Sequence, residues 1–294
     1  MARVLIIPDV HTRCTQADAI LSWETYDRVV WTGDFWDSWG DTPEIAEATA
    51  RWLKEKLGDP CNVMLLGNHD QSLRWCTNGF AFCSGLTEAK SHAVRKILTQ
   101  ADFERLLPFH VDQDILFTHA GLDEYWLSWA AAHGYAIPDA ATLSDIVSWL
   151  TEIWPVVRDR YDEGSCHPLL DVGQDRGGVQ RVGGLSWADF SNHHVIEGIR
   201  QICGHTIHLH VKGPLMRFKG AAGGRGSPVA KYVKDGVKPE WMERGWSLCL
   251  DTNLHHYLVI EDRKCTVKSV VWTRPRGQND FQVRPGSVIS SFDL

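Results

Sequence analysis

Short apolar runs that end abruptly in polar residues recur along this chain. The runs rich in β-branched residues have the length of buried strands and cover 3–7, 27–31, 61–66, 115–118 and 199–203. Between the early runs, 43–57 has the pattern of a helix, with Pro43 at its start and Gly58 just past its end. A second helical pattern covers 87–107 and is expected to break in its middle. Alternating strands and helices predict an α/β core.

The remainder of the chain has a different character. Residues 122–163 have a helical pattern rich in tryptophan and acidic residues, 164–185 are rich in glycine, and 212–244 are basic. Strand-like runs follow at 246–250, 255–260 and 266–272, and the last residues have the composition of a polar tail. We therefore predict one domain over residues 1–294, with a cap-like insert at 122–198 and a basic loop at 212–244.

Composition narrows the class of protein. The chain has 294 residues, of which 44% are hydrophobic and 23% charged, as in ordinary globular proteins. No apolar stretch is long enough to span a membrane, and the first apolar run is too short for a signal peptide, so we expect a cytoplasmic protein without membrane contact. The eight cysteines contain no C-x-x-C pair and are expected to be reduced. A net charge of −7 leaves nucleic acid possible only as a substrate.

Metal-binding side chains follow the predicted strands. In open α/β sheets, ligands bind beyond the carboxyl ends of the strands. The residues at those ends combine carboxylate, imidazole and amide groups: Asp9, His11, Asp34, Asn68, His119 and His205. Such a nitrogen and oxygen set suits manganese, iron, zinc or nickel. A carboxylate can bridge two cations about 3.5–4 Å apart, and Asp34 is the natural bridge.

The motifs around these residues resemble those of a known family. They read Asp9-Val10-His11, Gly33-Asp34-Phe35-Trp36-Asp37, Gly67-Asn68-His69-Asp70, Thr118-His119-Ala120-Gly121 and Gly204-His205-Thr206. In this order they resemble the motifs of the calcineurin-like metallophosphoesterases, closest to the phosphoprotein-phosphatase branch and its bacterial and phage relatives. Leu107-Pro108-Phe109 and Cys249-Leu250-Asp251-Thr252 also resemble that branch. The resemblance implies a two-sheet β sandwich flanked by helices, with a helical cap insert.

The resemblance also implies residue roles. Asp9 and His11 would hold a first divalent metal ion, and Asp34 would bridge it to a second. Asn68, His119 and His205 would complete the second position. His69 would donate a proton to the leaving oxygen, oriented by Asp37.

Some positions depart from the family pattern. Where many members carry a metal-binding histidine, this chain has Ile207, with His208 and His210 nearby. Either the first cation lacks that ligand, as in the phosphoprotein-phosphatase branch, or His208 reaches it. The arginine that commonly follows the second motif and binds phosphate is also absent. Arg13 and Arg74 are the substitutes that we consider for substrate binding.

We accordingly expect a dinuclear metal-dependent phosphomonoesterase, with manganese as the favoured metal. A metal-bridging hydroxide would attack phosphorus in line. Its substrate would be a phosphoprotein, a small phosphate ester or a nucleotide, and the oligomeric state stays open. The alternative is a phosphodiesterase or a nucleotide or dinucleoside polyphosphate hydrolase, which the basic 212–244 stretch and the absent arginine favour. A non-catalytic scaffold with the same fold is a third reading, which the complete ligand set disfavours.

Overall fold

The computed structural model describes residues 2–36, 40–75, 83–135, 142–207, 244–273 and 282–294. It also gives the backbone of short strands at 209–210, 213–214, 217–220 and 227–228. Asp37, His208, the side chain of His210 and nearly all of the predicted basic loop lie outside the described residues.

The first sheet has its N-terminal strands at one end. β1 (Val4–Ile7) runs parallel to β2 (Arg28–Trp31), which runs parallel to β3 (Asn62–Met64). On the other side of β1 the sheet continues antiparallel through β12 (His256–Glu261), β13 (Lys264–Thr273) and β14 (Gln282–Asp293). The order is β14-β13-β12-β1-β2-β3.

The second sheet is also mixed. Its order is β10-β9-β11-β6-β5-β4, with β6 (Arg200–Cys203) parallel to both β5 (Ile115–Thr118) and β11 (Trp246–Cys249). The outer strands are β4 (Phe109–Asp112), β9 (Arg217–Gly220) and β10 (Ser227–Pro228), all antiparallel to their neighbours. β7 (Leu209–His210) and β8 (Gly213–Pro214) form a separate pair.

The alternating side chains of β1 show how the sheets pack. Val4 and Ile6 join a buried cluster that includes Phe117 and Ile202 of the second sheet. Leu5 and Ile7 point to the opposite face and join a larger cluster with residues of the helices. The two sheets therefore pack face to face, and burial on both faces explains why β1 is wholly apolar.

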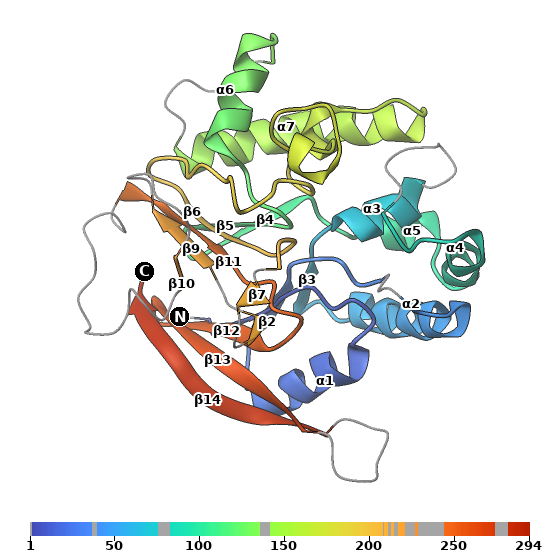
Figure 1. The fold of residues 1–294 in the computed structure, drawn as a ribbon, viewed down its shortest axis with the longest axis vertical. Helices are drawn as coiled ribbons and strands as arrows, with labels where there is room; N and C mark the ends of the chain where they lie inside the picture. Colours follow the sequence, from blue (N-terminus) through green and yellow to red (C-terminus); the bar gives the residue numbers. More distant parts are fainter. Residues whose placement is uncertain are drawn as a thin grey trace.

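Helices cover the outside of the sheets. α1 (Cys14–Trp23) and α2 (Pro43–Gly58) follow β1 and β2, and α3 (Asn68–Trp75) follows β3. The expected break at 87–107 is present, because α4 (Glu88–Arg95) and α5 (Gln100–Phe103) are separate helices. α6 (Glu124–Ala132) and α7 (Leu143–Asp162) lie at the end of the molecule opposite β13 and β14 (Figure 1). The 3₁₀ turns η2 (Pro168–Leu170) and η3 (Gln174–Arg176) come next.

The two flanked sheets confirm the predicted fold class, and the C-terminal segment, for which the sequence indicated only a polar tail, forms a strand. Residues 282–293 form the edge strand β14, most of whose described side chains are partly or fully exposed. The polar sequence of β14 does not show the apolar pattern of a strand, because an edge strand needs few buried positions. The cap role of residues 122–198 stays a prediction. Within the described residues, no helix has the length and apolarity to cross a bilayer.

Candidate metal centre

The residues that follow four of the strands meet at one edge of the sandwich. β1 and β2 are parallel and in register, so Asp9 and Asp34 leave the first sheet close together. β5 and β6 are parallel in the second sheet, which brings His119 and His205 to the matching edge. The backbone N–H of His205 donates to Asp9 Oδ2 over 2.7 Å, so the two edges are joined directly.

The loops at this edge have strained backbones. His11, Asp34 and His205 have φ angles of 42°, 49° and 69°, a region that residues other than glycine rarely adopt. Close approach between loops adds a second constraint, since a Cβ on Gly67 would lie 2.1 Å from Asp34 Oδ1. Strain of this kind persists where surrounding structure fixes the backbone, and it is frequent at functional sites.

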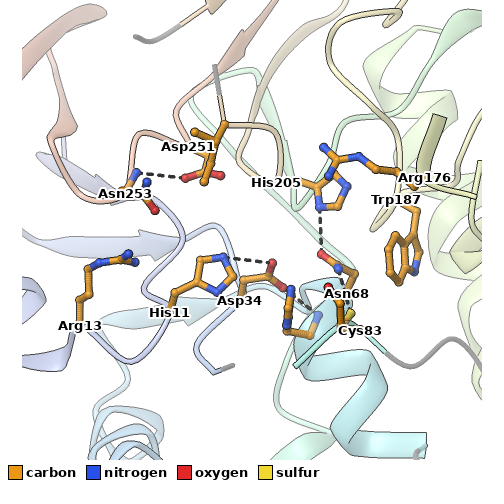
Figure 2. A pocket seen from close by; sticks show the side chains of 13 residues that line it. His11, Arg13, Asp34, Asn68, Cys83, Arg176, Trp187, His205, Asp251 and Asn253 are labelled. Atoms are coloured by element: carbon orange, nitrogen blue, oxygen red, sulfur yellow. Dashed lines mark hydrogen bonds and ion pairs between the residues drawn. The ribbon is translucent and has the colours of Figure 1, made fainter. Parts of the chain in front are cut away.

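Four ligand atoms converge at one point of the site. His119 Nε2 lies 2.9 Å from Asn68 Oδ1, 3.2 Å from His205 Nδ1 and 3.4 Å from Asp34 Oδ2. His205 Nδ1 in turn lies 2.9 Å from Asn68 Oδ1 (Figure 2). All four side chains are buried. This is the set expected at the second cation position.

The hydrogen bonds around this point turn ligand atoms toward one another. His119 Nδ1 lies 2.7 Å from the carbonyl oxygen of Thr32, so Nδ1 carries a proton and Nε2 is the nitrogen that would face a cation. The amide nitrogen of Asn68 donates to Cys83 Sγ over 3.0 Å, which turns the amide oxygen inward. Together with the Asp34 carboxylate, these atoms form an acceptor cluster that fits a divalent cation.

The electrostatics of the cluster favour positive charge. Burial alone would lower the pKa of His119, but the carboxylates of Asp34 and Asp9 raise it to about 10. Burial alone would raise the pKa of Asp34, yet the imidazoles of His119, His69 and His11 lower it well below its ordinary value. A position that stabilises a proton this strongly also stabilises a metal cation.

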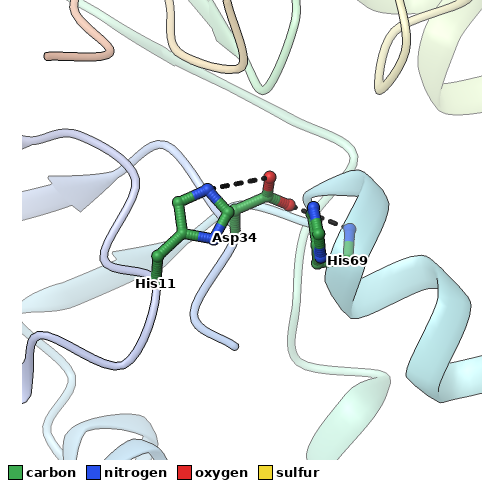
Figure 3. A group of neighbouring side chains, drawn as sticks. All are labelled: His11, Asp34 and His69. Atoms are coloured by element: carbon green, nitrogen blue, oxygen red, sulfur yellow. Dashed lines mark hydrogen bonds and ion pairs between the residues drawn. The ribbon is translucent and has the colours of Figure 1, made fainter. Parts of the chain in front are cut away.

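A second group of ligand atoms adjoins the first. His11 Nδ1 lies 3.1 Å from the carbonyl oxygen of Trp36, which leaves Nε2 free and 3.7 Å from Asp34 Oδ2. Ligand atoms of His11, Asp34 and His69 lie within 4.8 Å of one another (Figure 3). Asp34 thus belongs to both groups, as a bridging carboxylate would. Asp9 lies in neither group, and its two oxygens accept hydrogen bonds from Thr32 Oγ1 and the N–H of His205.

His69 is the second residue of α3 and lies at the edge of the site. Its backbone N–H donates to Asp34 Oδ1 over 2.9 Å, and its ring lies edge-on to that of His11, with centroids 5.0 Å apart. The side chain is partly exposed and lines the cavity, where a substrate could reach it. Its expected partner, Asp37, lies outside the described residues.

Asp70 joins the second and third loops. It is fully buried, and its carboxylate accepts the backbone N–H groups of Asp34 (2.8 Å), Phe35 (3.0 Å) and Gly67 (2.9 Å). These bonds position the Asp34 backbone in its strained conformation. Sequence reasoning noted Asp70 within a motif but gave it no role.

A cavity of about 660 Å³ opens over the ligand atoms. It has a polar floor and a mixed rim. Its lining comes from loops of both sheets and from the segment after α7: His11, Arg13, Asp34, Asn68, His69, Cys83, Ser84, Arg176, Trp187, His205, Ile207, Asp251 and Asn253.

The two arginines considered for phosphate binding have different positions. Arg13 lines the cavity, and its Nη1 is buried without a hydrogen-bond partner among the described residues. Arg74 is buried away from the cavity, donates to the carbonyl oxygen of Phe103 and lies over the ring of Trp75. The position of Arg74 gives it a packing role, and we do not retain it as a substrate-binding residue.

Arg176 is a cavity residue that sequence reasoning missed. Its Nε donates to Asp189 Oδ2 over 2.9 Å and its Nη2 to Thr206 Oγ1 over 3.3 Å, so the guanidinium is fixed in place. Its position in the glycine-rich segment 164–185 gave no signal, because that segment lies far along the chain from the motifs.

Comparison with known proteins identifies the family and agrees with this fold. A model of the calcineurin-like phosphoesterase family matches residues 2–208. The chain therefore belongs to the calcineurin-like phosphoesterase family and is a metal-dependent phosphoester hydrolase. Members of this family usually bind two divalent metals. No curated protein matches the chain.

Solved structures give more distant likenesses. A metallophosphoesterase from Sphaerobacter thermophilus is 14% identical, with a TM-score of 0.41, covering 88% of this chain and 84% of that one. A mutant cold-active protein tyrosine phosphatase is 12% identical, with a TM-score of 0.47 and coverages of 92% and 78%. A protein serine/threonine phosphatase from Saccharomyces cerevisiae is 13% identical, with a TM-score of 0.42 and coverages of 97% and 79%.

The role of Asp70 can be tested by Asp70→Ala. The change leaves three buried N–H groups without an acceptor, so we expect the free energy of unfolding to fall by about 2–4 kcal/mol. Cation affinity should fall at least about tenfold, because Asp34 loses its support. Urea denaturation and titration calorimetry with Mn²⁺ measure the two effects. Asp59→Ala, which removes an exposed carboxylate that accepts one N–H, is the control. Wild-type cation affinity in Asp70→Ala would contradict the assignment.

Proposed function

We propose that this protein is a phosphomonoesterase that uses two divalent cations, with manganese as the favoured pair. The observation that carries the proposal is the pair of ligand groups that share Asp34, directly below a cavity that also holds His69 and two arginines. Asp34, Asn68, His119 and His205 would hold the second cation, and Asp9, His11 and Asp34 the first. Two cations so placed would supply an activated water and neutralise phosphoryl charge.

The arginines support a monoester as substrate. A phosphomonoester carries up to two negative charges, and its oxygens need cationic donors. Nη1 of Arg176 and Nη1 of Arg13 have no hydrogen-bond partner among the described residues, and both guanidinium groups line the cavity. The sequence argument for a diester or nucleotide substrate relied on an absent arginine and on the 212–244 stretch. Arg176 offers a guanidinium in the cavity in place of the absent arginine. Nearly all of the 212–244 stretch lies outside the described residues.

His69 is suited to give up the proton. Its imidazole lies at the cavity wall, with a ring nitrogen within 4.8 Å of a carboxylate oxygen of Asp34. An imidazolium next to the leaving oxygen can protonate that oxygen as its bond to phosphorus breaks.

The proposed function is tested by the isosteric change Asp34→Asn. Replacing the shared carboxylate should reduce hydrolysis of p-nitrophenyl phosphate by about 10³-fold or more and weaken cation binding, because both positions lose a charged ligand. Activity assays with Mn²⁺, Ni²⁺ and Zn²⁺, and a count of bound metal, are the measurements. The bis-ester should be hydrolysed more slowly than the monoester by the wild-type protein. A faster rate on the bis-ester would favour the diesterase reading.

The proton-donor role predicts a leaving-group effect in His69→Ala. We expect turnover to fall by about 10²–10⁴-fold on phenyl phosphate, whose leaving group needs a proton, and far less on p-nitrophenyl phosphate. Bound cations should remain at the wild-type count. Equal losses on both substrates, or loss of a cation, would assign His69 to another role.

The phosphate-binding role of Arg176 is tested by Arg176→Met. Loss of a charge-assisted hydrogen bond should raise KM, and the inhibition constant of inorganic phosphate, by about 10–100-fold. Cation content should not change. Arg181→Met, on an exposed arginine that lies over Tyr125, is the matched control. An unchanged phosphate inhibition constant in Arg176→Met would exclude this role.

A further inference from the structure

Asp251 lies at the same edge as the ligand residues. β11 and β6 are parallel, with Cys249 beside Cys203. His205 stands two residues beyond Cys203, and Asp251 stands two residues beyond Cys249. The register therefore brings Asp251 to the end of the strand next to the one that delivers His205. The family match ends at residue 208, and the roles implied by the resemblance do not include Asp251.

The surroundings of Asp251 leave one oxygen without a partner. The residue is 1% exposed, and its Oδ1 accepts the N–H of Asn253 over 3.2 Å. Oδ2 is buried and has no hydrogen-bond partner among the described residues. The side chain lines the cavity on the side of His11 and Arg13 (Figure 2). A buried carboxylate oxygen without a partner is strongly unfavourable unless a cation or donor joins it.

Neighbouring charges add to this demand for positive charge. Burial, followed by the carboxylates of Asp9 and Asp34, raises the pKa of Asp251 well above its ordinary value. Asp251 is the charged group that acts most strongly on the Arg13 guanidinium. Among the described residues no hydrogen bond or ion pair joins Asp251 to Arg13, so Oδ2 of Asp251 has no direct partner there.

The two cation positions are unequally supplied with protein ligands. The second has four converging atoms. The first has His11 Nε2 and the shared Asp34 Oδ2, while both oxygens of Asp9 accept hydrogen bonds from Thr32 Oγ1 and the His205 N–H, each over 2.7 Å. Ile207, at the place where many family members carry a ligand, has no lone pair to offer. The first position therefore has fewer converging ligand atoms than the second, and the Asp251 carboxylate lines the same cavity.

We propose that the Asp251 carboxylate belongs to the first cation site and binds that cation together with His11 and Asp34. This assignment rests on the proposed function, because it needs a cation at the first position. The assignment accounts for the buried Oδ2 of Asp251 that has no partner and for the proximity of this carboxylate to those of Asp9 and Asp34. It also accounts for the smaller number of protein ligands at the first cation position.

The test compares Asp251→Asn with Asn253→Gly. Asn253→Gly removes a polar side chain from the same cavity wall, and glycine tolerates the φ of 54° at that position. Bound Mn²⁺ is counted after dialysis, and both affinities are measured by titration calorimetry. We expect wild type and Asn253→Gly to bind two cations. Asp251→Asn should retain one and bind the other at least about tenfold more weakly.

Thermal unfolding supplies a readout that a merely structural role would not give. In chelator, Asp251→Asn should unfold at or above the wild-type temperature, because it removes a buried carboxyl group whose charged form is disfavoured by burial and by Asp9 and Asp34. With Mn²⁺ the order should invert, because the wild type gains more from binding. Asp251→Ser serves as a second variant if Asp251→Asn does not fold.

The outcomes separate the two claims. Wild-type affinity for both cations in Asp251→Asn would overturn the assignment of Asp251 while leaving the proposed function intact. A KM effect with unchanged cation binding would likewise overturn it and place Asp251 on the substrate. A wild-type protein that binds no cation would overturn the proposed function itself.

Discussion

The structure depends on one electrostatic constraint, which is that buried ligand atoms gather at one point and draw positive charge to it. His119 Nε2, His205 Nδ1 and Asn68 Oδ1 lie within 3.2 Å of one another, and the Asp34 carboxylate adjoins them. The carboxylates raise the pKa of His119 to about 10, so a proton on this imidazole supplies part of that positive charge. A divalent cation bound at the same atoms would supply more of it, so the site is organised for positive charge.

The two sheets and their loops hold these ligand atoms close together. Parallel register within each sheet sets the strand ends side by side, and the bond from the His205 N–H to Asp9 joins the two edges. Asp70 then fixes two loops from beneath by accepting three backbone N–H groups. The left-handed backbone at Asp34 is maintained by these bonds, since a free chain would relax it.

The sequence predicted most of this edge, because polar residues after apolar runs mark strand ends directly. The helical pattern at 87–107 predicted the break between α4 and α5, and the family resemblance implied the face-to-face sheets. It failed where function depends on contacts distant in the chain. Arg176 reaches the cavity through bonds to Asp189 and Thr206, and no local pattern reveals those bonds. Arg74 was misread because a buried arginine over a tryptophan has the same sequence appearance as a phosphate ligand.

The link between Asp9 and His205 has a consequence for how folding and cation binding are coupled. The two residues belong to different sheets and are 196 positions apart, yet their hydrogen bond closes the edge where the ligands lie. Any opening of the sandwich at this edge separates His119 and His205 from Asp34. A cation held by all three favours the closed arrangement by mass action, because an open edge cannot bind it with the same affinity. Cation binding at this edge would therefore be coupled to the packing of the two sheets, and the two would form one cooperative unit.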